Sequence, residues 1–511
     1  MSNPAIDLAL KTVKQSANRP LHPFYGEEVK IKGGLFDKTK IIVLSDSGLA
    51  VVKNNGKKIE EKYTWFDFKQ FDYEDEQLTI VIGTTTYSLQ VPEGSQLIKK
   101  IGDALQMVLT PIELMAINPN LKSKPTPKSA YYRATIKYPK YADEIGEILK
   151  FSKDTMIITQ ENFTPFISIV PLISSLTTLI IEFPLTADQY QDFISFLSKG
   201  SKIQQINFDG PVPQEFNAMM NTIAHNIHTE INSLSFTNSL LSDLNMQSIL
   251  TAMNSQPIKS IAFHGTFTTQ TFYFYETFLP AIRKSPRYIN LANTNSVNLK
   301  TLYTQRLAVI SLEGTGIDIS TIFESLSLYR ENLQNLRMIN VSNNICSKRI
   351  DYNKKMPPLL KSIFADSIQW RGFHMRSFFE LIFRNYTKHL FKLSFQYQSA
   401  TQGDWNSIND LFSVTSFANF VGLNWSGNPV NLSFISFLSR QKYLQFLNVS
   451  ECFSDEKANE IKLFGNYLEG CTCLKKIVMR GNQIKNVGKM VGYLFSILVK
   501  KQVPNIDLSD N

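Results

Sequence analysis

Two patterns in the sequence are typical of an α/β protein, in which a solenoid of strand-plus-helix repeats follows a β-meander with a C-terminal helix. From Leu176 onward one phrase recurs: an apolar residue, two variable residues, an apolar residue, one variable residue and an apolar residue, often with Asn soon after. Within the first 115 residues, strand-like stretches alternate with turn signals and end in one amphipathic segment. The first pattern predicts a repeat array, and the second predicts a smaller domain in front of it.

Residues 1–20 predict a leading amphipathic helix, because apolar residues recur through the segment and prolines follow it at Pro20 and Pro23. Its apolar residues are Ile6, Leu8, Leu10 and Val13.

Residues 21–115 predict a domain of about seven strands closed by one helix. The strand-like stretches are 29–32, 40–44, 49–52, 63–71, 78–82 and 86–91, with turn signals at Gly33-Gly34, Asp46-Ser47-Gly48, Asn54-Asn55-Gly56 and Gly83. The closing helix has one apolar stripe, formed by Leu97, Ile98, Ile101, Leu105, Val108 and Leu109. This order of elements resembles a pleckstrin-homology domain.

Residues 116–130 predict a linker, because residues 118–129 contain three prolines and three lysines. Residues 131–175 mix a helical segment at 142–151 with aromatic and β-branched residues. A solenoid needs its first apolar face covered, so these residues are expected to form the N-terminal cap of the repeats.

Residues 176–511 predict about 13 leucine-rich repeats, the last of them incomplete. The clearest copy runs from Leu336 to Asn344. The thirteen starts are Leu176, Ile203, Ile231, Ile258, Pro286, Leu307, Leu336, Leu360, Leu390, Phe420, Leu444, Leu474 and Val503. Steps between starts run from 21 to 30 residues and mostly from 27 to 30, which leaves room for a helix after each strand. Such units stack into a horseshoe with strands on the concave side and helices on the convex side.

The composition favours a binding protein that is not an enzyme. The sequence contains no phosphate-binding glycine loop, nucleophile elbow or zinc-protease helix, so we expect no catalytic residues and no cofactor. The four cysteines follow no disulfide or metal framework, which predicts reduced thiols, no metal site and a cytoplasmic protein.

The order of a leading helix, a pleckstrin-homology fold, a linker and long repeats resembles the front half of the CARMIL family of actin-regulatory scaffolds. The local match is Ile101-Gly102-Asp103-Ala104-Leu105 in the closing helix, where no tryptophan lies between Glu93 and Ile117. This resemblance implies a scaffold that links a site near the plasma membrane to regulators of the actin cytoskeleton. In that family a C-terminal tail binds actin capping protein, and the present sequence contains no such tail.

Positive charge in the N-terminal domain gathers in its first hairpin. Residues 22–115 contain 11 basic and 14 acidic side chains, a net charge of −3, although the whole chain has +9. Lys30, Lys32, Lys38 and Lys40 alternate with apolar residues, which predicts one solvent-facing basic patch. Three roles are open for it: specific binding of phosphoinositides, weak attraction to anionic lipid, and a purely structural role. A domain with net negative charge argues against a nucleic-acid partner.

The variable positions of the repeat phrase are expected to face the concave side and to bind a protein partner. The candidates are Arg337, Met338, Phe391, Tyr397, Lys475 and Arg480. Two alternatives are a GTPase activator that presents Arg337 or Arg480, and an inhibitor-like recognition solenoid with no cytoskeletal role.

Asparagines after the strands, Asn344, Asn428, Asn482 and Asn511, are expected to form a hydrogen-bonded ladder between repeats. The sequence stops within a repeat phrase, which leads us to expect a fragment of a longer protein, a mobile last repeat, or a homodimer that covers the end.

Overall fold

The structure is a computed structural model of residues 1–511. It describes the chain apart from residues 1–2, 17–21, 33–36, 75–76, 92, 125, 151–152, 171–172, 174, 199–201, 213–214, 226–229, 267–272, 285, 388–389, 415–418, 454–457, 483–486 and 511. The predicted turn at Gly33-Gly34 and the ladder residue Asn511 therefore lie outside the described residues. The chain divides into two compact units, residues 1–206 with 226–230, and residues 207–225 with 231–511.

The first unit begins with a seven-stranded antiparallel sheet, in the order β4-β3-β2-β1-β7-β6-β5. The strands are β1 (Pro23–Ile31), β2 (Lys38–Ser45), β3 (Gly48–Lys53), β4 (Ile59–Thr64), β5 (Phe68–Glu74), β6 (Gln77–Ile82) and β7 (Thr85–Gln90), with the short turn η1 (Trp65–Asp67) between β4 and β5. Helix α2 (Leu97–Val108) follows the last strand and packs its apolar stripe on the sheet. The closing helix is confirmed, and so are the predicted strands except the stretch 63–71. The structure divides that stretch between the end of β4, the turn η1 and β5, and most of β4 precedes it.

The two faces of β2 and β3 are both covered, which explains their continuous apolar sequence. On one face, Ile42, Leu44, Leu49 and Val51 join the main core beneath α2. On the other, Ile41, Val43, Ala50 and Val52 pack against α1 (Pro4–Gln15). The predicted leading helix is thus confirmed, and Asn3 caps it by accepting a hydrogen bond from the Ala5 N–H at 3.0 Å.

The segment predicted as a linker is instead bound to the N-terminal domain. Helix α3 (Pro111–Ile117) extends into it, and α4 (Pro127–Lys137) begins before residue 130. Between them, Leu121 packs on the domain core and the Lys124 N–H donates to the Gln106 carbonyl at 3.2 Å. One of the three prolines that suggested an extended linker, Pro127, stands at the start of α4, where proline is tolerated.

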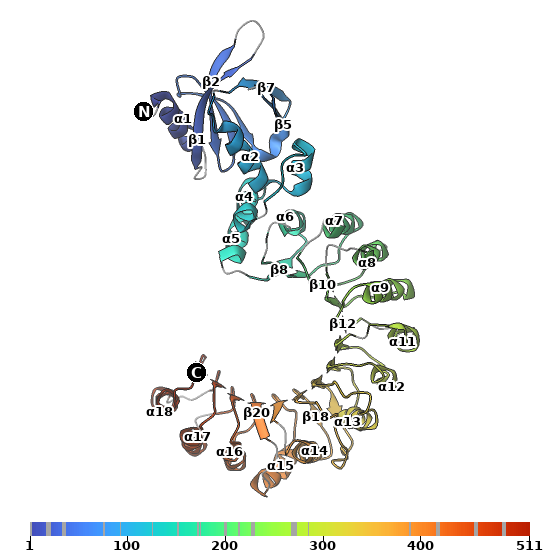
Figure 1. The fold of residues 1–511 in the computed structure, drawn as a ribbon. Helices are drawn as coiled ribbons and strands as arrows, with labels where there is room; N and C mark the ends of the chain where they lie inside the picture. Colours follow the sequence, from blue (N-terminus) through green and yellow to red (C-terminus); the bar gives the residue numbers. More distant parts are fainter. Residues whose placement is uncertain are drawn as a thin grey trace. The chain divides into compact units, whose positions relative to one another are not determined.

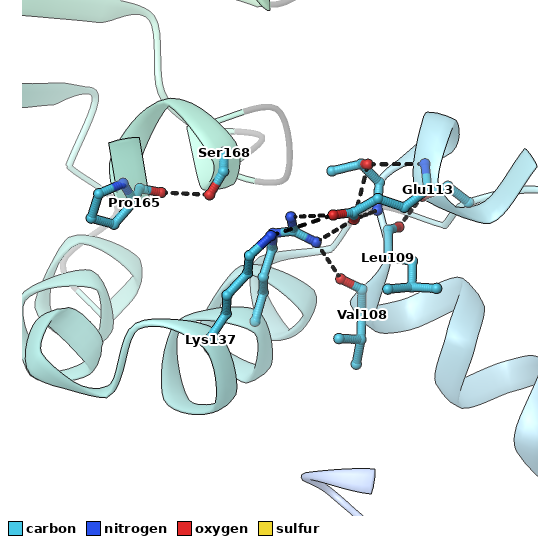
Figure 2. A network of polar contacts seen from close by, with 9 residues as sticks. Val108, Leu109, Glu113, Lys137, Pro165 and Ser168 are labelled. Atoms are coloured by element: carbon cyan, nitrogen blue, oxygen red, sulfur yellow. Dashed lines mark hydrogen bonds and ion pairs between the residues drawn. The ribbon is translucent and has the colours of Figure 1, made fainter. Parts of the chain in front are cut away.

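A buried ion pair joins α3 to α4 (Figure 2). Arg133, only 2% exposed, donates through both terminal nitrogens to the Glu113 carboxylate, at 2.5 and 2.8 Å. It also donates to the Val108 carbonyl at 3.3 Å, and Lys137 approaches Glu113 to 3.6 Å. The remaining elements of this part are η2 (Pro139–Tyr141), α5 (Ala142–Lys150) and α6 (Phe163–Ile169).

The repeats form a parallel sheet of fourteen strands, in the chain order β8 to β15, β17 and β19 to β23. After β8 (Thr155–Ile158), the strands are β9 (Thr178–Ile181), β10 (Gln205–Asp209), β11 (Ser233–Thr237), β12 (Ser260–His264), β13 (Tyr288–Asn290), β14 (Val309–Ser311), β15 (Met338–Asn340), β17 (Ser362–Phe364), β19 (Leu390–Ser394), β20 (Asn419–Asn424), β21 (Phe446–Asn448), β22 (Lys476–Val478) and β23 (Asn505–Asp507). All thirteen predicted repeat strands are confirmed. Strand β8 was not predicted from the sequence; it pairs with β9 from within the predicted cap.

Helices follow most of the strands. They are α7 (Ala187–Ser198), α8 (Phe216–His225), α9 (Asp243–Ser255), η4 (Phe274–Phe278) with α11 (Leu279–Ala281), α12 (Leu299–Leu302), α13 (Ile319–Leu328), α14 (Met375–Asn385), α15 (Gln402–Val414), α16 (Leu432–Ser439), α17 (Ala458–Gly470) and α18 (Val487–Lys500). A short second ladder joins β16 (Ile345–Cys346) to β18 (Gln369–Trp370). Within the second unit, helices lie on one side of the strands (Figure 1); the opposite face of the sheet is called the strand side below.

One repeat departs from its predicted frame. Leu390 was expected to be the first core residue and Phe391 to face a partner, but Leu390 is 48% exposed and Phe391 is fully buried. Phe391 stacks on Tyr386 with ring centroids 4.1 Å apart and pairs with Phe420 in the next strand. The register shifts after this residue because β19 has one residue fewer between its core positions than β20. Phe391 is therefore a core residue, and the prediction that it binds a partner is wrong.

Candidate functional site

The strand side of β12 to β17 presents aligned rows of side chains, because neighbouring strands pair in register. Tyr288 pairs with Val309, Val309 with Met338, and Met338 with Ser362. The first three are half-buried and form an apolar row across adjacent strands, about 4.8 Å apart. Met338, named from the sequence, thus lies beside two residues that the sequence analysis did not name.

A basic row lies directly before the apolar row. It consists of Lys259, Arg287, Arg337 and Lys361, all exposed. The backbone ladder sets their order: the Arg287 N–H donates to the Lys259 carbonyl at 2.7 Å, and the Lys361 N–H donates to the Arg337 carbonyl at 2.9 Å. Ala308 fills the place between Arg287 and Arg337. In the described part of the chain, no ion pair involves any of these four cations.

Two carboxylates lie at the opposite ends of these strands, and both are engaged within the protein. Glu313 accepts hydrogen bonds from the amide groups of Asn340 at 3.0 Å and Asn343 at 2.6 Å. Asp366 accepts from Ser394 and from the backbone and side chain of Gln396, at 3.0 to 3.1 Å. Burial raises the pKa of Asp366, although these hydrogen bonds oppose the shift. Among the residues that the structure describes, the strand side is therefore polarised, with cations outside any ion pair where strands begin and hydrogen-bonded carboxylates where they end.

Tyr397 forms a bridge across a neighbouring repeat. Its backbone is left-handed, with φ of +50°, a conformation that is rare for a bulky residue. The ring lies against Gly427, where an added Cβ would approach it to 2.2 Å, and the hydroxyl donates to Glu451 Oε1 at 2.7 Å. The hydrogen bond to Glu451 raises the pKa of the Tyr397 hydroxyl. Tyr397 is 45% exposed, so it remains accessible at the strand end, as expected from the sequence.

Lys475 and Arg480 lie near the end of the array. Lys475 is exposed. Arg480 donates from Nε to Asp507 at 2.7 Å, and its Nη2 makes a second contact with the same carboxylate. The Arg480 guanidinium holds the pKa of Asp507 well below its usual range. Because Arg480 is engaged, Arg337 is the arginine with more freedom to contact a partner.

The four hairpin lysines do not share one face of the sheet. Val29 pairs with Lys40 and Lys30 pairs with Thr39, so an even-numbered residue of β1 lies opposite an odd-numbered residue of β2. Lys38 and Lys40 therefore project to the face of buried Val29, and Lys30 projects to the other. The expectation of one basic patch is wrong. In the observed register Lys30 lies opposite Thr39 and not opposite a lysine, so Lys30 and Lys40 project to opposite faces of the sheet.

Lys40 also has a partner within the domain. Its ammonium group lies 2.5 Å from a Glu60 carboxylate oxygen. The hydrogen bond from Lys40 lowers the pKa of Glu60, and Lys53 and Lys38 add to the effect. Lys32 donates to Gln77 Oε1 at 2.8 Å, whereas Lys30 and Lys38 are exposed.

The ladder asparagines are buried and bonded to backbone groups of their own and the preceding repeat. Asn344, 4% exposed, donates to the carbonyls of Leu312 at 2.7 Å and Val341 at 2.9 Å, and accepts from the Gly316 N–H at 2.9 Å. Asn482 accepts from the N–H groups of Cys452 and Phe453 at 2.8 and 2.9 Å.

Asn428 accepts from the Gln398 N–H at 3.0 Å and donates to the Phe395 carbonyl. Each of the three side chains satisfies backbone groups that no strand pairing reaches.

Neither a metal-binding cluster nor a helix long and apolar enough to cross a membrane occurs in the part of the chain that the structure describes. The surface residues that the sequence analysis missed are Lys259, Arg287, Lys361, Tyr288, Val309, Glu313 and Asp366. Lys259, Arg287 and Lys361 could have been predicted from the sequence, because each occupies the second position of its repeat phrase, as Arg337 does.

Comparison with known proteins identifies no family. No family model and no curated protein matches the sequence. One similar solved structure is titled "Crystal structure of TLR13-ssRNA13 complex", with 13% sequence identity and a TM-score of 0.38. The match covers 66% of the present chain and 53% of that chain, so it spans about half of the other protein's length. The repeat fold and its strand side define a class, that of solenoid proteins with a surface suited to recognition, and at this TM-score the likeness adds nothing more specific.

Proposed function

We propose that this chain is a non-enzymatic scaffold that binds a protein partner on the strand side of its repeats. The observation that carries the proposal is the unpaired row of Lys259, Arg287, Arg337 and Lys361, next to the half-buried apolar row. Large side chains such as Tyr288 and Met338 bury much apolar surface on binding, and the arginines beside this apolar row add directional hydrogen bonds.

In the finer form of the proposal, the chain is a CARMIL-like scaffold. Its leading helix, seven-stranded sheet, closing helix and repeats follow the order that the resemblance implies. The N-terminal domain would then act as a pleckstrin-homology-like module with weak attraction to anionic lipid, and the repeats would hold a regulator of the actin cytoskeleton. Lys30 and Lys38 are the cations most available for lipid, because Lys40 is paired with Glu60.

Affinity purification from cells tests the protein-binding role. The full chain is compared with a Val309→Glu/Met338→Glu variant, which places two charges in the apolar row. The matched control is Leu244→Glu/Leu328→Glu, which adds the same charges at residues 66% and 74% exposed on α9 and α13. A partner lost only from the first variant supports the proposal, and actin regulators among the lost proteins support its finer form. A full set of partners retained by the Val309→Glu/Met338→Glu chain would contradict it.

A further inference from the structure

The unmatched charge on the strand side is positive. Glu313 and Asp366 accept hydrogen bonds from the following repeat, whereas the four cations of the basic row have no ion-pair partner in the described residues. Four like charges on neighbouring strands repel one another, and a partner with acidic groups relieves that repulsion. The complementary partner is therefore acidic where it meets this row.

The spacing of the cations fits a helix that crosses the strands. Lys259, Arg287, Arg337 and Lys361 directly precede β12, β13, β15 and β17, at about 0, 5, 14 and 19 Å along the sheet. Acidic residues at i, i+3, i+10 and i+14 of an α-helix lie at roughly 0, 4.5, 15 and 21 Å along its axis and share one stripe. Side chains on one face of an extended strand, about 6.6 Å apart, fit these intervals too, but that face offers a single row of side chains, whereas a helix offers two adjacent stripes.

The apolar row adds a second requirement. Tyr288, Val309 and Met338 lie directly beside the basic row, because each begins its strand and follows Arg287, Ala308 or Arg337 by one residue. A matching helix therefore needs an apolar stripe next to its acidic stripe. A nucleic acid would offer phosphates to the cations but would also bring charge close to Glu313 and Asp366 at the other strand ends.

We propose that strands β12 to β17 bind an amphipathic helix of the partner protein, with its acidic stripe on the basic row and its apolar stripe on Tyr288, Val309 and Met338. This inference rests on the proposed function and specifies the partner's chemistry. The two stripes together fix the orientation of the helix across the strands.

Fluorescence anisotropy with synthetic helices tests the inference. The probe is a labelled helical peptide of about 18 residues, with Glu at i, i+3, i+10 and i+14 and Leu on the adjacent stripe. The reference peptide has the same composition with the acidic residues on the opposite side. The full chain should bind the probe more tightly than the reference peptide, and binding should weaken as salt is raised.

Charge reversal locates the binding surface. Arg287→Glu/Arg337→Glu/Lys361→Glu should weaken binding of the probe by about tenfold or more. The control reverses three exposed lysines of the N-terminal domain, Lys57, Lys58 and Lys69, and alters the net charge equally without altering affinity. Circular dichroism of each variant verifies that the repeats are folded.

Three results would overturn the inference: equal binding of both peptides, undiminished binding by the triple variant, or tighter binding of a single-stranded oligouridine that the triple variant abolishes. None of these results decides the proposed function, which affinity purification tests separately. A non-helical or uncharged protein partner would still be lost from the Val309→Glu/Met338→Glu chain in that experiment.

Discussion

Removing the buried ion pair between α3 and α4 should loosen both helices by a predictable amount. Glu113→Gln leaves the Arg133 guanidinium, 2% exposed, without a counter-charge, and loss of one partner from a buried pair costs about 3 kcal/mol. Arg133 keeps its hydrogen bond to the Val108 carbonyl and its position 5.0 Å from the Phe66 ring, so α4 should remain docked but open more often.

The lowered pKa of Glu113 corresponds to an energy of similar size. Burial raises this pKa, but hydrogen bonding and charge from Arg133 outweigh burial and lower it from 4.5 to about 2. A shift of that size corresponds to at most about 3.4 kcal/mol, and solvent screening of a side chain that is 32% exposed reduces it to about 2 kcal/mol. Because the folded-state pKa is depressed, this stabilisation is complete above pH 4.5 and is lost as the pH falls toward 2.

Amide hydrogen exchange of α3 and α4 in the full chain measures the effect locally. At neutral pH, Glu113→Gln should speed exchange of these helices by about 30-fold or more, the equivalent of 2 kcal/mol or above. Glu161→Gln is the control, since it removes only the exposed pair with Lys140 and should leave exchange unchanged.

A double-mutant cycle with Arg133→Met completes the test. The double variant should be more stable than the sum of the single changes predicts, by about 2 kcal/mol, because it removes both charges. Additive effects, or the same loss of stability between pH 4.5 and 2 in the wild type and in Glu113→Gln, would show that the pair does not stabilise this part of the fold.

Three further changes test other parts of the structure. Tyr397→Asn should raise the free energy of unfolding by about 1 kcal/mol, because Asn tolerates the left-handed backbone; a lower melting temperature would mean that the ring contact outweighs the strain. Asn428→Ala should lower the free energy of unfolding by about 1–3 kcal/mol, and the control Asn505→Ala, at an exposed position, should lower it by far less. Equal melting temperatures for the two variants would show that the asparagine ladder does not stabilise the repeats. In cosedimentation of the full chain with anionic liposomes, Lys38→Ala should reduce binding more than Lys40→Ala, and the reverse order would show that the ion pair with Glu60 opens at the membrane.

The repeat strands could be predicted because each one repeats the same core spacing. Leu336, Ile339 and Val341 are fully buried, and equivalent residues recur through the array, so a single phrase defines every strand. Strand β8 could not be found in this way, since it precedes the first full phrase and its pairing with β9 is a tertiary feature. The frame at Leu390 was ambiguous because Leu390 and Phe391 are both apolar, and only packing against Tyr386 and the next strand decides between them.

The candidate surface was harder to predict because the availability of a charged side chain depends on its neighbours, and these come from repeats 21 to 30 residues away. Arg337 and Arg480 look alike in the sequence, yet only Arg480 is paired, through Asp507 of the following strand. Asp507 lies opposite Val478, two residues before Arg480, and this relation can be read by aligning the phrases as columns. The same alignment places Arg337 between Ala308 and Lys361, neither of which can neutralise it. Binding in such an array is therefore specified by the residues at one equivalent position in successive repeats. A single repeat phrase cannot show which of its charged side chains remain available to a partner.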